Sequence, residues 1–168
     1  MEEEHDYPEV PPAPKYYLHN ACIGDLCVDG TVKVLGSPRL IMRGLGSPLV
    51  ISSGSSTPTL LDTWNTPTEI RGWTPHENGG AFAATQEASY SVQARVGVPV
   101  GVDLSQVSLS LFVGENAYCS VRGSTHLSCV VPLQTGDTLS VRVSHTLGSD
   151  LTLAAEVDQT GFDATQVL

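Results

Sequence analysis

The segment FAATQEASYSVQARV, residues 82–96, alternates apolar and polar side chains from Ser89 onward. One face of the segment carries Tyr90, Val92, Ala94 and Val96, and the opposite face carries Ser91, Gln93 and Arg95. Successive side chains of a β-strand point to opposite sides, so this alternation predicts a strand with one buried face. The apolar face needs further strands to cover it, because one strand cannot bury its side chains alone.

Further segments with the same alternation follow at intervals of about ten residues. They are residues 107–114, 116–133, 137–147 and 150–157. Residues 116–133 predict a hairpin whose tip lies at residues 122–125, where Gly123 marks a turn. Many short alternating strands separated by turn residues are typical of sandwiches and jelly rolls, so we predict an all-β fold.

The charge balance limits the classes of partner. Lys and Arg together number 8 against 18 Asp and Glu, which gives a formal net charge of −10. Nucleic acids and anionic membranes attract basic surfaces, so this charge argues against both as partners. No stretch approaches about eighteen consecutive apolar residues, and we therefore expect no membrane insertion.

The first fifteen residues, MEEEHDYPEVPPAPK, are acidic, rich in proline and nearly free of aliphatic side chains. Such a composition cannot form a packed core. One interpretation is a disordered, solubilising tail. The interpretation that we carry forward is a docking tail that orders on a partner. Its predicted anchors are Tyr7, Val10, Tyr16 and Tyr17. The chain begins with acids rather than a basic and then apolar leader, so we expect no secretory signal.

A ten-residue repeat lies between the tail and the alternating strands. LGSPRLIMRG, residues 35–44, is followed directly by LGSPLVISSG, residues 45–54. Glycine and proline at fixed places indicate a strand–turn unit used twice, and such units bury their apolar faces against neighbours. We predict a short β stalk and linker over residues 16–59 and a head over residues 60–168. An ordinary pair of strands is the alternative.

Two segments of the head carry a family resemblance. FAATQEASYSVQA resembles the strand motif of the C1q/TNF-like trimeric jelly rolls, and Phe82 and Tyr90 match two of its aromatic positions. Ala88 stands where that motif has glycine, and Val92 and Ala94 replace further aromatics. LQTGDTLSV, residues 133–141, is similar to the family's leucine, Gly-Asp and alternating-strand signature. The resemblance covers roughly residues 60–162.

The resemblance implies a jelly-roll head that assembles as a homotrimer around a threefold axis. In such trimers one sheet of each subunit packs apolar residues against the axis, and function is multivalent recognition. The aromatic side chains expected in the trimer contact or the core are Trp64, Trp73, Phe82, Tyr90 and Phe112. A sugar-stacking platform is the alternative for the two tryptophans.

Cys119 and Cys129 lie on the two arms of the predicted hairpin. They form either a cross-strand disulfide or two buried free thiols. Residues in the loops at one end of the head are candidate apex contacts, namely Arg122, Thr125, His126 and His145. The sequence contains no HExxH, GxSxG or phosphate-binding glycine motif, so we predict no catalytic residues, no metal and no cofactor.

These observations favour a non-enzymatic virion structural protein. We expect a trimeric capsid-surface spike, fibre or decoration, anchored to the capsid by its tail. Its head would lie at the virion surface for attachment to a receptor or glycan, or for stabilising the shell. The alternative is a secreted, extracellular C1q/TNF-like multivalent ligand or lectin-like module. That alternative predicts an oxidised Cys119–Cys129 pair and a precursor with a signal peptide.

Overall fold

The computed structural model describes residues 21–23, 26–28, 37–55, 57–65 and 67–167. The chain divides into two compact units, Met1–Leu35 and Gly36–Leu168. In the first unit, β1 (Ala21–Ile23) pairs antiparallel with β2 (Leu26–Val28), and the register places Cys22 opposite Cys27. The second unit contains every other strand and is called the head below.

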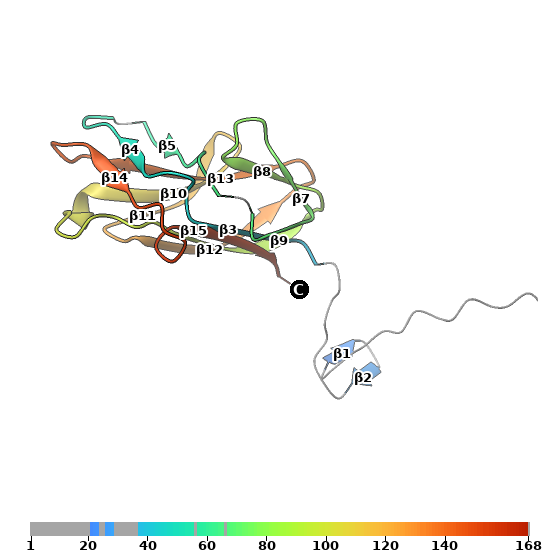
Figure 1. Ribbon diagram of the computed structural model, residues 1–168. Coiled ribbons are helices and arrows are strands. Elements are labelled where there is room, and N and C mark those ends of the chain that lie inside the picture. Colours follow the sequence, from blue (N-terminus) through green and yellow to red (C-terminus); the bar gives the residue numbers. More distant parts are fainter. Residues whose placement is uncertain (1–20, 24–25, 29–36, 56, 66, 168) are drawn as a thin grey trace, which may run out of the picture. The chain divides into compact units, whose positions relative to one another are not determined.

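The head consists of two antiparallel sheets packed face to face (Figure 1). The five-stranded sheet contains, in spatial order, β12 (His126–Leu133), β9 (Ala88–Arg95), β15 (Gly161–Gln166), β3 (Arg39–Arg43) and β6 (Glu69–Arg71). The six-stranded sheet contains β11 (Asn116–Arg122), β10 (Val107–Val113), β13 (Thr138–His145), β8 (Ala81–Ala84) and β7 (Trp73–Pro75), with β5 (Thr59–Leu60) beside β13.

Two smaller elements complete the head. β4 (Leu49–Ile51) pairs with β14 (Leu151–Leu153) in a separate two-stranded sheet. A short 3-10 helix, Leu104–Gln106, leads into β10. Asp103 caps this turn, because its side chain accepts a hydrogen bond from the backbone N–H of Ser105 at 3.0 Å.

The chain passes back and forth between the two sheets. β9 lies in the five-stranded sheet, β10 and β11 form a hairpin in the six-stranded sheet, and β12 returns to the first. β13 then crosses again, and β15 closes the five-stranded sheet between β9 and β3. This path is a jelly roll, so the predicted all-β, jelly-roll fold class is confirmed.

The core lies between the sheets. On β9, Tyr90, Val92 and Ala94 are buried, as the alternation predicts, and β10 and β13 supply leucines and valines opposite them. Full burial of one such aliphatic side chain contributes roughly 1.5–3 kcal/mol to stability. Aromatic contacts join the layers, with the rings of Trp73 and Tyr90 4.9 Å apart between centroids.

The predicted stalk is wrong for residues 39–51. β3 is paired with β15 on one side and β6 on the other, inside the head. Leu40 and Met42 have exposed fractions of 0% and 2%, so the first copy of the repeat finds its neighbours among distant strands of the same chain. β4, in the second copy, pairs with β14. Residues 1–20 and 29–36 lie outside the described residues.

The predicted hairpin of residues 116–133 is also wrong. β11 pairs with β10 and β12 pairs with β9, so the two segments belong to opposite sheets. Alternation identifies a strand with one buried face, but it does not specify the partner of that strand. The turn at Gly123, with φ of +80°, carries the chain from one layer to the other instead.

Candidate recognition surface

The five aromatic side chains expected in the core or the trimer contact are taken up within the single head. Trp73, Phe82 and Tyr90 are buried in the core, and half-buried Trp64 packs against it. Phe112 lies on the outward face of the six-stranded sheet, opposite Ser140 on β13. The guanidinium of Arg142 covers its ring, with Cζ 4.2 Å from the ring centroid. Apart from the partly exposed Trp64, these side chains are therefore buried within the one head.

The two outward sheet faces differ from what the family resemblance implies. In the six-stranded sheet, Ser110, Ser140 and Arg142 alternate with the buried leucines and valines. In the five-stranded sheet the outward positions of β9 are Ser89, Ser91, Gln93 and Arg95. The apolar sheet face expected around a threefold axis is therefore not found on either sheet within the described residues.

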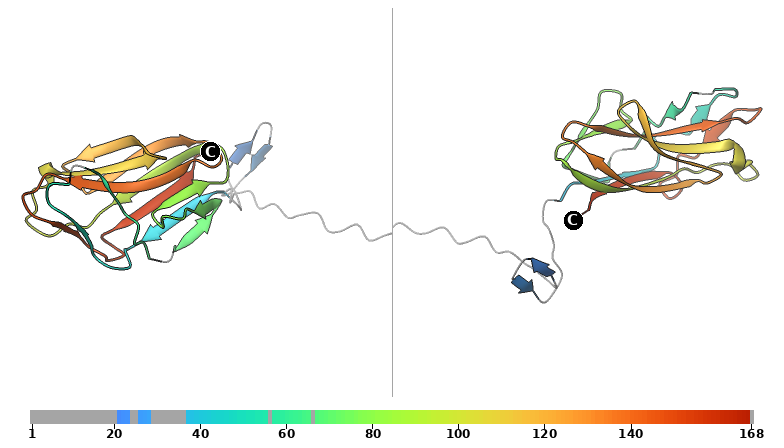
Figure 2. Two further views of the ribbon diagram at one scale, coloured as in Figure 1. Left: turned by 90° about the horizontal axis from the view of Figure 1, so that it is seen from above. Right: turned by 180° about the vertical axis from the view of Figure 1, so that it is seen from behind.

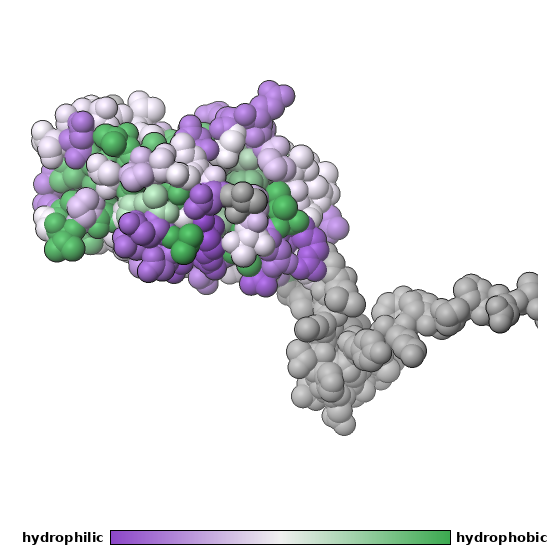
Figure 3. Space-filling view, viewed as in Figure 1, coloured by the Kyte–Doolittle hydropathy of each residue, from purple (hydrophilic) through white to green (hydrophobic). Residues whose placement is uncertain are grey.

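Exposed apolar side chains occur in separate places. In Figure 3 several hydrophobic residues appear at the end of the head away from the C-terminus. Val100, in the connection between β9 and β10, is fully exposed, and Val50 on β4 is 55% exposed. Val130, on the outward face of β12, is 54% exposed. Val100 lines one shallow pocket with Pro48, Val98 and Pro99, so the apolar side chains at that end are grouped.

Two loops that the sequence marked as candidate contacts lie at one end of the head. The register places Arg122 opposite Ser108 and His145 opposite the neighbouring Val107. Residues 123–125 and 146–150 therefore extend beyond the same end of the sheets, and Figure 2 shows this end opposite the C-terminus. Backbone hydrogen bonds tie each loop to neighbouring segments, since Val96 N–H donates to Thr125 O at 3.0 Å and Thr146 N–H donates to Gln106 O at 2.9 Å.

Arg122, Thr125 and His126 lie at this end, and their role as contacts stays a prediction. The exposed Arg122 side chain donates from Nε to Ser105 O at 2.6 Å. Thr125 Oγ1 lies 3.1 Å from His126 Nδ1, and the backbone N–H of His126 donates to Ser124 Oγ at 3.1 Å. These bonds hold the loop in a defined conformation, so it presents a fixed polar surface.

His145 is not an apex contact. Its side chain is only 3% exposed, and its Nε2 donates to the backbone oxygen of Ile51 at 3.0 Å. The alternation on β13 turns this residue inward, and its imidazole joins β13 to β4. The residue is therefore structural.

Cys119 and Cys129 form a disulfide between β11 and β12. Because these strands belong to opposite sheets, the bond joins the two layers rather than two arms of a hairpin. Tyr118 reinforces the same edge, since its hydroxyl donates to Val130 O at 3.3 Å. The neighbouring loop with Arg122 and Thr125 is thereby tied to both sheets.

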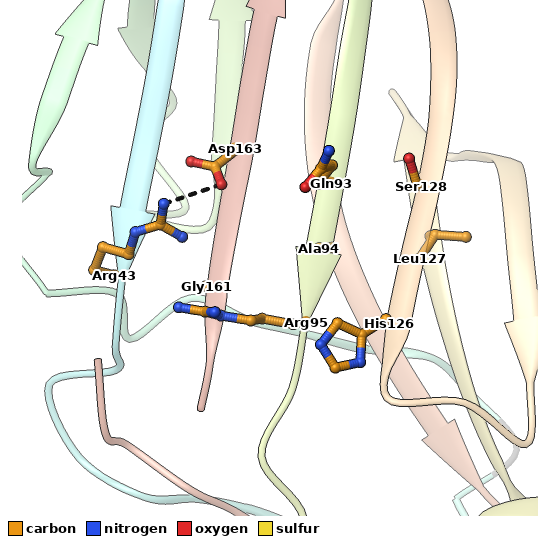
Figure 4. A pocket seen from close by; sticks show the side chains of 9 residues that line it. All are labelled: Arg43, Gln93, Ala94, Arg95, His126, Leu127, Ser128, Gly161 and Asp163. Carbon is orange, nitrogen blue, oxygen red and sulfur yellow. Dashed lines mark ion pairs between the residues drawn. The ribbon is translucent and has the colours of Figure 1, made fainter. Parts of the chain in front are cut away.

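A row of basic residues on the five-stranded sheet was not predicted from the sequence. The row crosses four strands and contains three basic residues, Arg43, Arg95 and His126 (Figure 4). Gly161 lies in the same row between the two arginines. These four residues line a cleft of about 500 Å³ together with Gln93, Ser128 and Asp163. The alternation of β9 placed Arg95 on an exposed face, but it gave no indication of its cross-strand neighbours.

The remaining sequence predictions concern the tail, metal binding and membrane insertion. Tyr7, Val10, Tyr16 and Tyr17 lie outside the described residues. Within the described part of the chain, no three His, Cys, Asp or Glu side chains are grouped to hold a metal ion. The described residues also include no helix of sufficient length and apolar character to span a bilayer.

Hydrogen bonds from the side chains of Gln106 and Ser105 hold the pKa of Asp103 below its usual value, as suits a capping carboxylate.

The fold of the head is similar to those of solved structures. The chain is similar to Eiger TNF from S. frugiperda, with a TM-score of 0.58 and 12% identity over 79% of this chain and 94% of that one. It is also similar to murine APRIL, with a TM-score of 0.56 and 15% identity over 77% of this chain and 98% of that one. No protein-family model matches the sequence, and no curated protein matches it either.

The head therefore has the TNF-like jelly-roll fold. Both matched chains are covered almost completely, so the likeness concerns a whole sandwich rather than one sheet. At these identities the likeness establishes the fold alone.

Proposed function

We propose that this chain is a non-enzymatic, extracellular recognition module that acts as a homotrimer and binds a partner on a cell surface. The fold carries this proposal, because the head is similar over nearly the full length of two TNF-like chains. TNF-like jelly rolls act as trimeric ligands, and a trimer presents the same loop surface three times.

The disulfide supports the extracellular location. Cys119 and Cys129 are joined across the two sheets. Disulfides persist in oxidising environments and are rare in the cytosol. The ligand hypothesis predicts this bond, whereas the capsid-surface hypothesis depends on residues 1–20, which lie outside the described residues. The comparisons favour the ligand hypothesis and give the virion role no support.

The polar outward faces of both sheets limit the kinds of interaction that could hold the proposed trimer together. Because neither sheet offers an apolar face, subunit contacts in this chain would depend on hydrogen bonds and ion pairs as well as on apolar area. Such contacts weaken at high ionic strength. The proposed receptor surface is the loop end that carries Arg122 and Thr125.

The direct test is binding of the fluorescently labelled full chain to a panel of cells. We expect saturable binding that unlabelled chain displaces, and we expect the double substitution Arg122→Ala/Thr125→Ala to weaken it. Thr135→Ala is the matched control, because Thr135 is an exposed residue in the β12–β13 loop at the opposite end of the head.

Equal loss of cell binding in the control and the loop variant would place the contact elsewhere. Absence of saturable binding on every cell type would contradict the proposed recognition function. Thermal unfolding of each variant separates a lost contact from a lost fold.

A further inference from the structure

The short hairpin that precedes the head in the sequence contains the second pair of cysteines. The register of β1 and β2 makes Cys22 and Cys27 direct cross-strand partners. Directly opposed residues of an antiparallel pair share one face of it, and they are the nearest neighbours across the two strands. The register therefore places the two cysteines at one position of the hairpin and on one face.

The connection between the strands decides which kind of pair the cysteines form. In CIGDLC, residues 22–27, Gly24 and Asp25 are the only residues between the end of β1 and the start of β2. The dipeptide Gly-Asp is typical of two-residue hairpin connections. In such a hairpin the pair next to the turn is hydrogen-bonded, and the pair types alternate along the strands. The cysteines are the second pair, so they belong to the non-hydrogen-bonded type.

A disulfide can join a pair of the non-hydrogen-bonded type without moving the backbone. The Cα atoms of such a pair lie about 4.5 Å apart, against about 5.5 Å in the hydrogen-bonded type. A disulfide accepts Cα separations of about 4.4–6.8 Å and holds its Cβ atoms about 3.5–4.5 Å apart. Cβ atoms come closest in the non-hydrogen-bonded type. The register alone thus supplies the backbone geometry of a cross-strand disulfide.

A hairpin as short as this one needs further stabilisation. Each strand has three residues, and β1 and β2 form a two-stranded sheet by themselves (Figure 1). An isolated two-stranded hairpin is marginally stable at best in water. A covalent bond that closes so short a loop removes conformations of the open chain. The loop-entropy relation gives a factor on the order of tens in favour of the closed hairpin.

Proximity in the chain decides the partner of each cysteine. The sequence has four cysteines, and Cys119 and Cys129 are already joined within the head. Cys22 and Cys27 can therefore pair with each other or with a second copy of the chain. Two groups joined by a short flexible linker meet at an effective concentration on the order of millimolar, far above that of a second copy in dilute solution. Pairing within the hairpin is therefore favoured over cross-linking.

We propose that Cys22 and Cys27 are a site of oxidative modification, where a disulfide closes the hairpin. A small disulfide, glutathione disulfide, is the oxidant. The thiolate of one cysteine attacks it to form a mixed disulfide, and one glutathione leaves as its thiolate. The thiolate of the other cysteine then attacks the cysteine sulfur of the mixed disulfide and releases the second glutathione. The two cysteines lose two electrons and two protons, and the two glutathione molecules gain them.

This bond uses the last two thiols of the chain. The copies in the proposed homotrimer are then held together without a covalent link between them, and the oxidised chain has no thiol that reacts with alkylating reagents. The inference goes beyond the proposed function, because the hairpin belongs to the first compact unit and not to the head. It shares with that function only the oxidising environment in which disulfides persist.

The test is peptide mapping of the full chain without reduction. The purified chain is equilibrated with reduced and oxidised glutathione, free thiols are blocked with iodoacetamide, and trypsin then cuts after Lys15 and Lys33. Peptide 16–33 contains Cys22 and Cys27 and no other cysteine. We expect this peptide to carry no alkyl group and to be lighter than its reduced form by two hydrogen atoms. A gel without reducing agent should show the mass of one chain.

A matched variant tests whether the register, and not nearness alone, forms the bond. Cys27→Ser/Val28→Cys moves the second thiol by one residue along β2. Successive residues of a strand face opposite ways, so the register then places the two thiols on opposite faces. We expect the equilibrium constant for oxidation by glutathione to fall by about tenfold or more, because the bond no longer favours the hairpin.

Three results would overturn the proposal. They are alkylated cysteines in peptide 16–33 under oxidising conditions, a joined peptide of twice the mass that shows cross-linked copies, and equal oxidation of the shifted variant.

The bond within the head is the internal reference. Trypsin cuts after Arg122, so the Cys119–Cys129 disulfide is detected as two joined peptides in the same digest. Reduction of the hairpin pair alone would overturn only the present proposal. Reduction of both pairs would overturn it and would also remove the support that the head disulfide gives to the extracellular location.

Discussion

Two glycines of the head share a backbone conformation but differ in their surroundings. Gly44 has φ of +70° and Gly54 has φ of +72°, a region that side chains disfavour. A Cβ at Gly44 would lie 2.6 Å from the backbone oxygen of Ala155, whereas nothing lies within 4 Å of one at Gly54. The pair therefore separates backbone strain from close packing.

We predict that Gly54→Ala lowers the free energy of unfolding by about 1 kcal/mol through backbone strain alone. Gly44→Ala should cost about 1–3 kcal/mol more, because the chain that includes Ala155 must move away. Urea unfolding of the two variants measures the difference. Equal losses of stability would show that residues 44 and 155 do not approach in solution.

Tyr90 combines a buried ring with one polar contact. Its side chain is fully buried, and its hydroxyl donates to the backbone oxygen of Gln86 at 3.0 Å. Burial raises the pKa of Tyr90 above its ordinary value of 10.0, because the charged phenolate loses hydration. The neutral hydroxyl is therefore part of the folded state.

The pH dependence follows from the direction of this shift. Above pH 10 the unfolded chain releases the Tyr90 proton while the folded chain keeps it, so the stability linked to this group falls as the pH rises through the folded pKa. Below pH 10 that stability is fully present. We predict that Tyr90→Phe is less stable than the unchanged chain at pH 7, by about 1 kcal/mol for the lost hydrogen bond.

The same variant should lose less stability between pH 9 and pH 11 than the unchanged chain does. Urea unfolding at several pH values compares the two chains, and other titrating groups cancel in the difference. Parallel pH curves for the two chains would contradict the assignment to Tyr90.

For single residues, the sequence predicted which side chains are buried better than which neighbours they contact. The alternation of residues 89–96 placed Tyr90 inside and Arg95 outside, because both facts follow from local strand geometry. It did not reveal that Arg95 lies between Gly161 and His126, since those neighbours depend on strand pairing over long sequence separations. His145 was expected in an exposed loop, but it is the last inward residue of β13.

Among the elements, β11 and β12 are held by a covalent bond between sheets. The Cys119–Cys129 disulfide closes a loop of sequence separation 10. Such a bond limits the conformations of the unfolded chain, and the loop-entropy relation gives about 3 kcal/mol for this length.

We predict that Cys119→Ser/Cys129→Ser lowers the unfolding free energy by about 3 kcal/mol. Reducing agent should lower the melting temperature of the unchanged chain but not that of the double variant. Thiol titration in denaturant gives an independent check in a Cys22→Ser/Cys27→Ser background. We expect no reactive thiol there, and finding two would mean that Cys119 and Cys129 are unpaired.

Truncation before or after β3 tests where the head begins. Its core residues Leu40 and Met42 are buried, and its partner β15 is the last strand of the chain. We predict that deleting residues 1–35 leaves the unfolding transition of the head nearly unchanged, whereas deleting residues 1–46 abolishes it. Calorimetry distinguishes the two results. A cooperative transition in the shorter chain would show that β3 is dispensable and would favour a separate stalk.

Each element was easier to predict than its place in a sheet. The repeat at residues 35–54 correctly suggested strands, because apolar runs bounded by Gly and Pro are typical of them. Its two copies join different sheets, where β3 pairs with β15 and β4 pairs with β14. Pairing of this kind depends on the C-terminal strands, so no short window of sequence contains the information.

For the whole molecule, the jelly roll explains both the composition and the separation of charge. Few charges are needed because much of the chain lies in strands with one buried face. Of the charged residues present, arginine is concentrated on the five-stranded sheet. The head thus offers two surfaces of different chemistry, a polar loop end and a basic sheet face.

The mass of the chain in solution tests directly whether the head acts as the proposed homotrimer. Light scattering on a sizing column, over a wide range of protein concentration and at low and high salt, measures the mass in solution. One chain has a mass of 17.8 kDa. We predict three times that mass at low salt, maintained on dilution, with dissociation favoured as ionic strength rises. A mass of one chain under every condition would contradict the trimer and leave a free-standing β-sandwich.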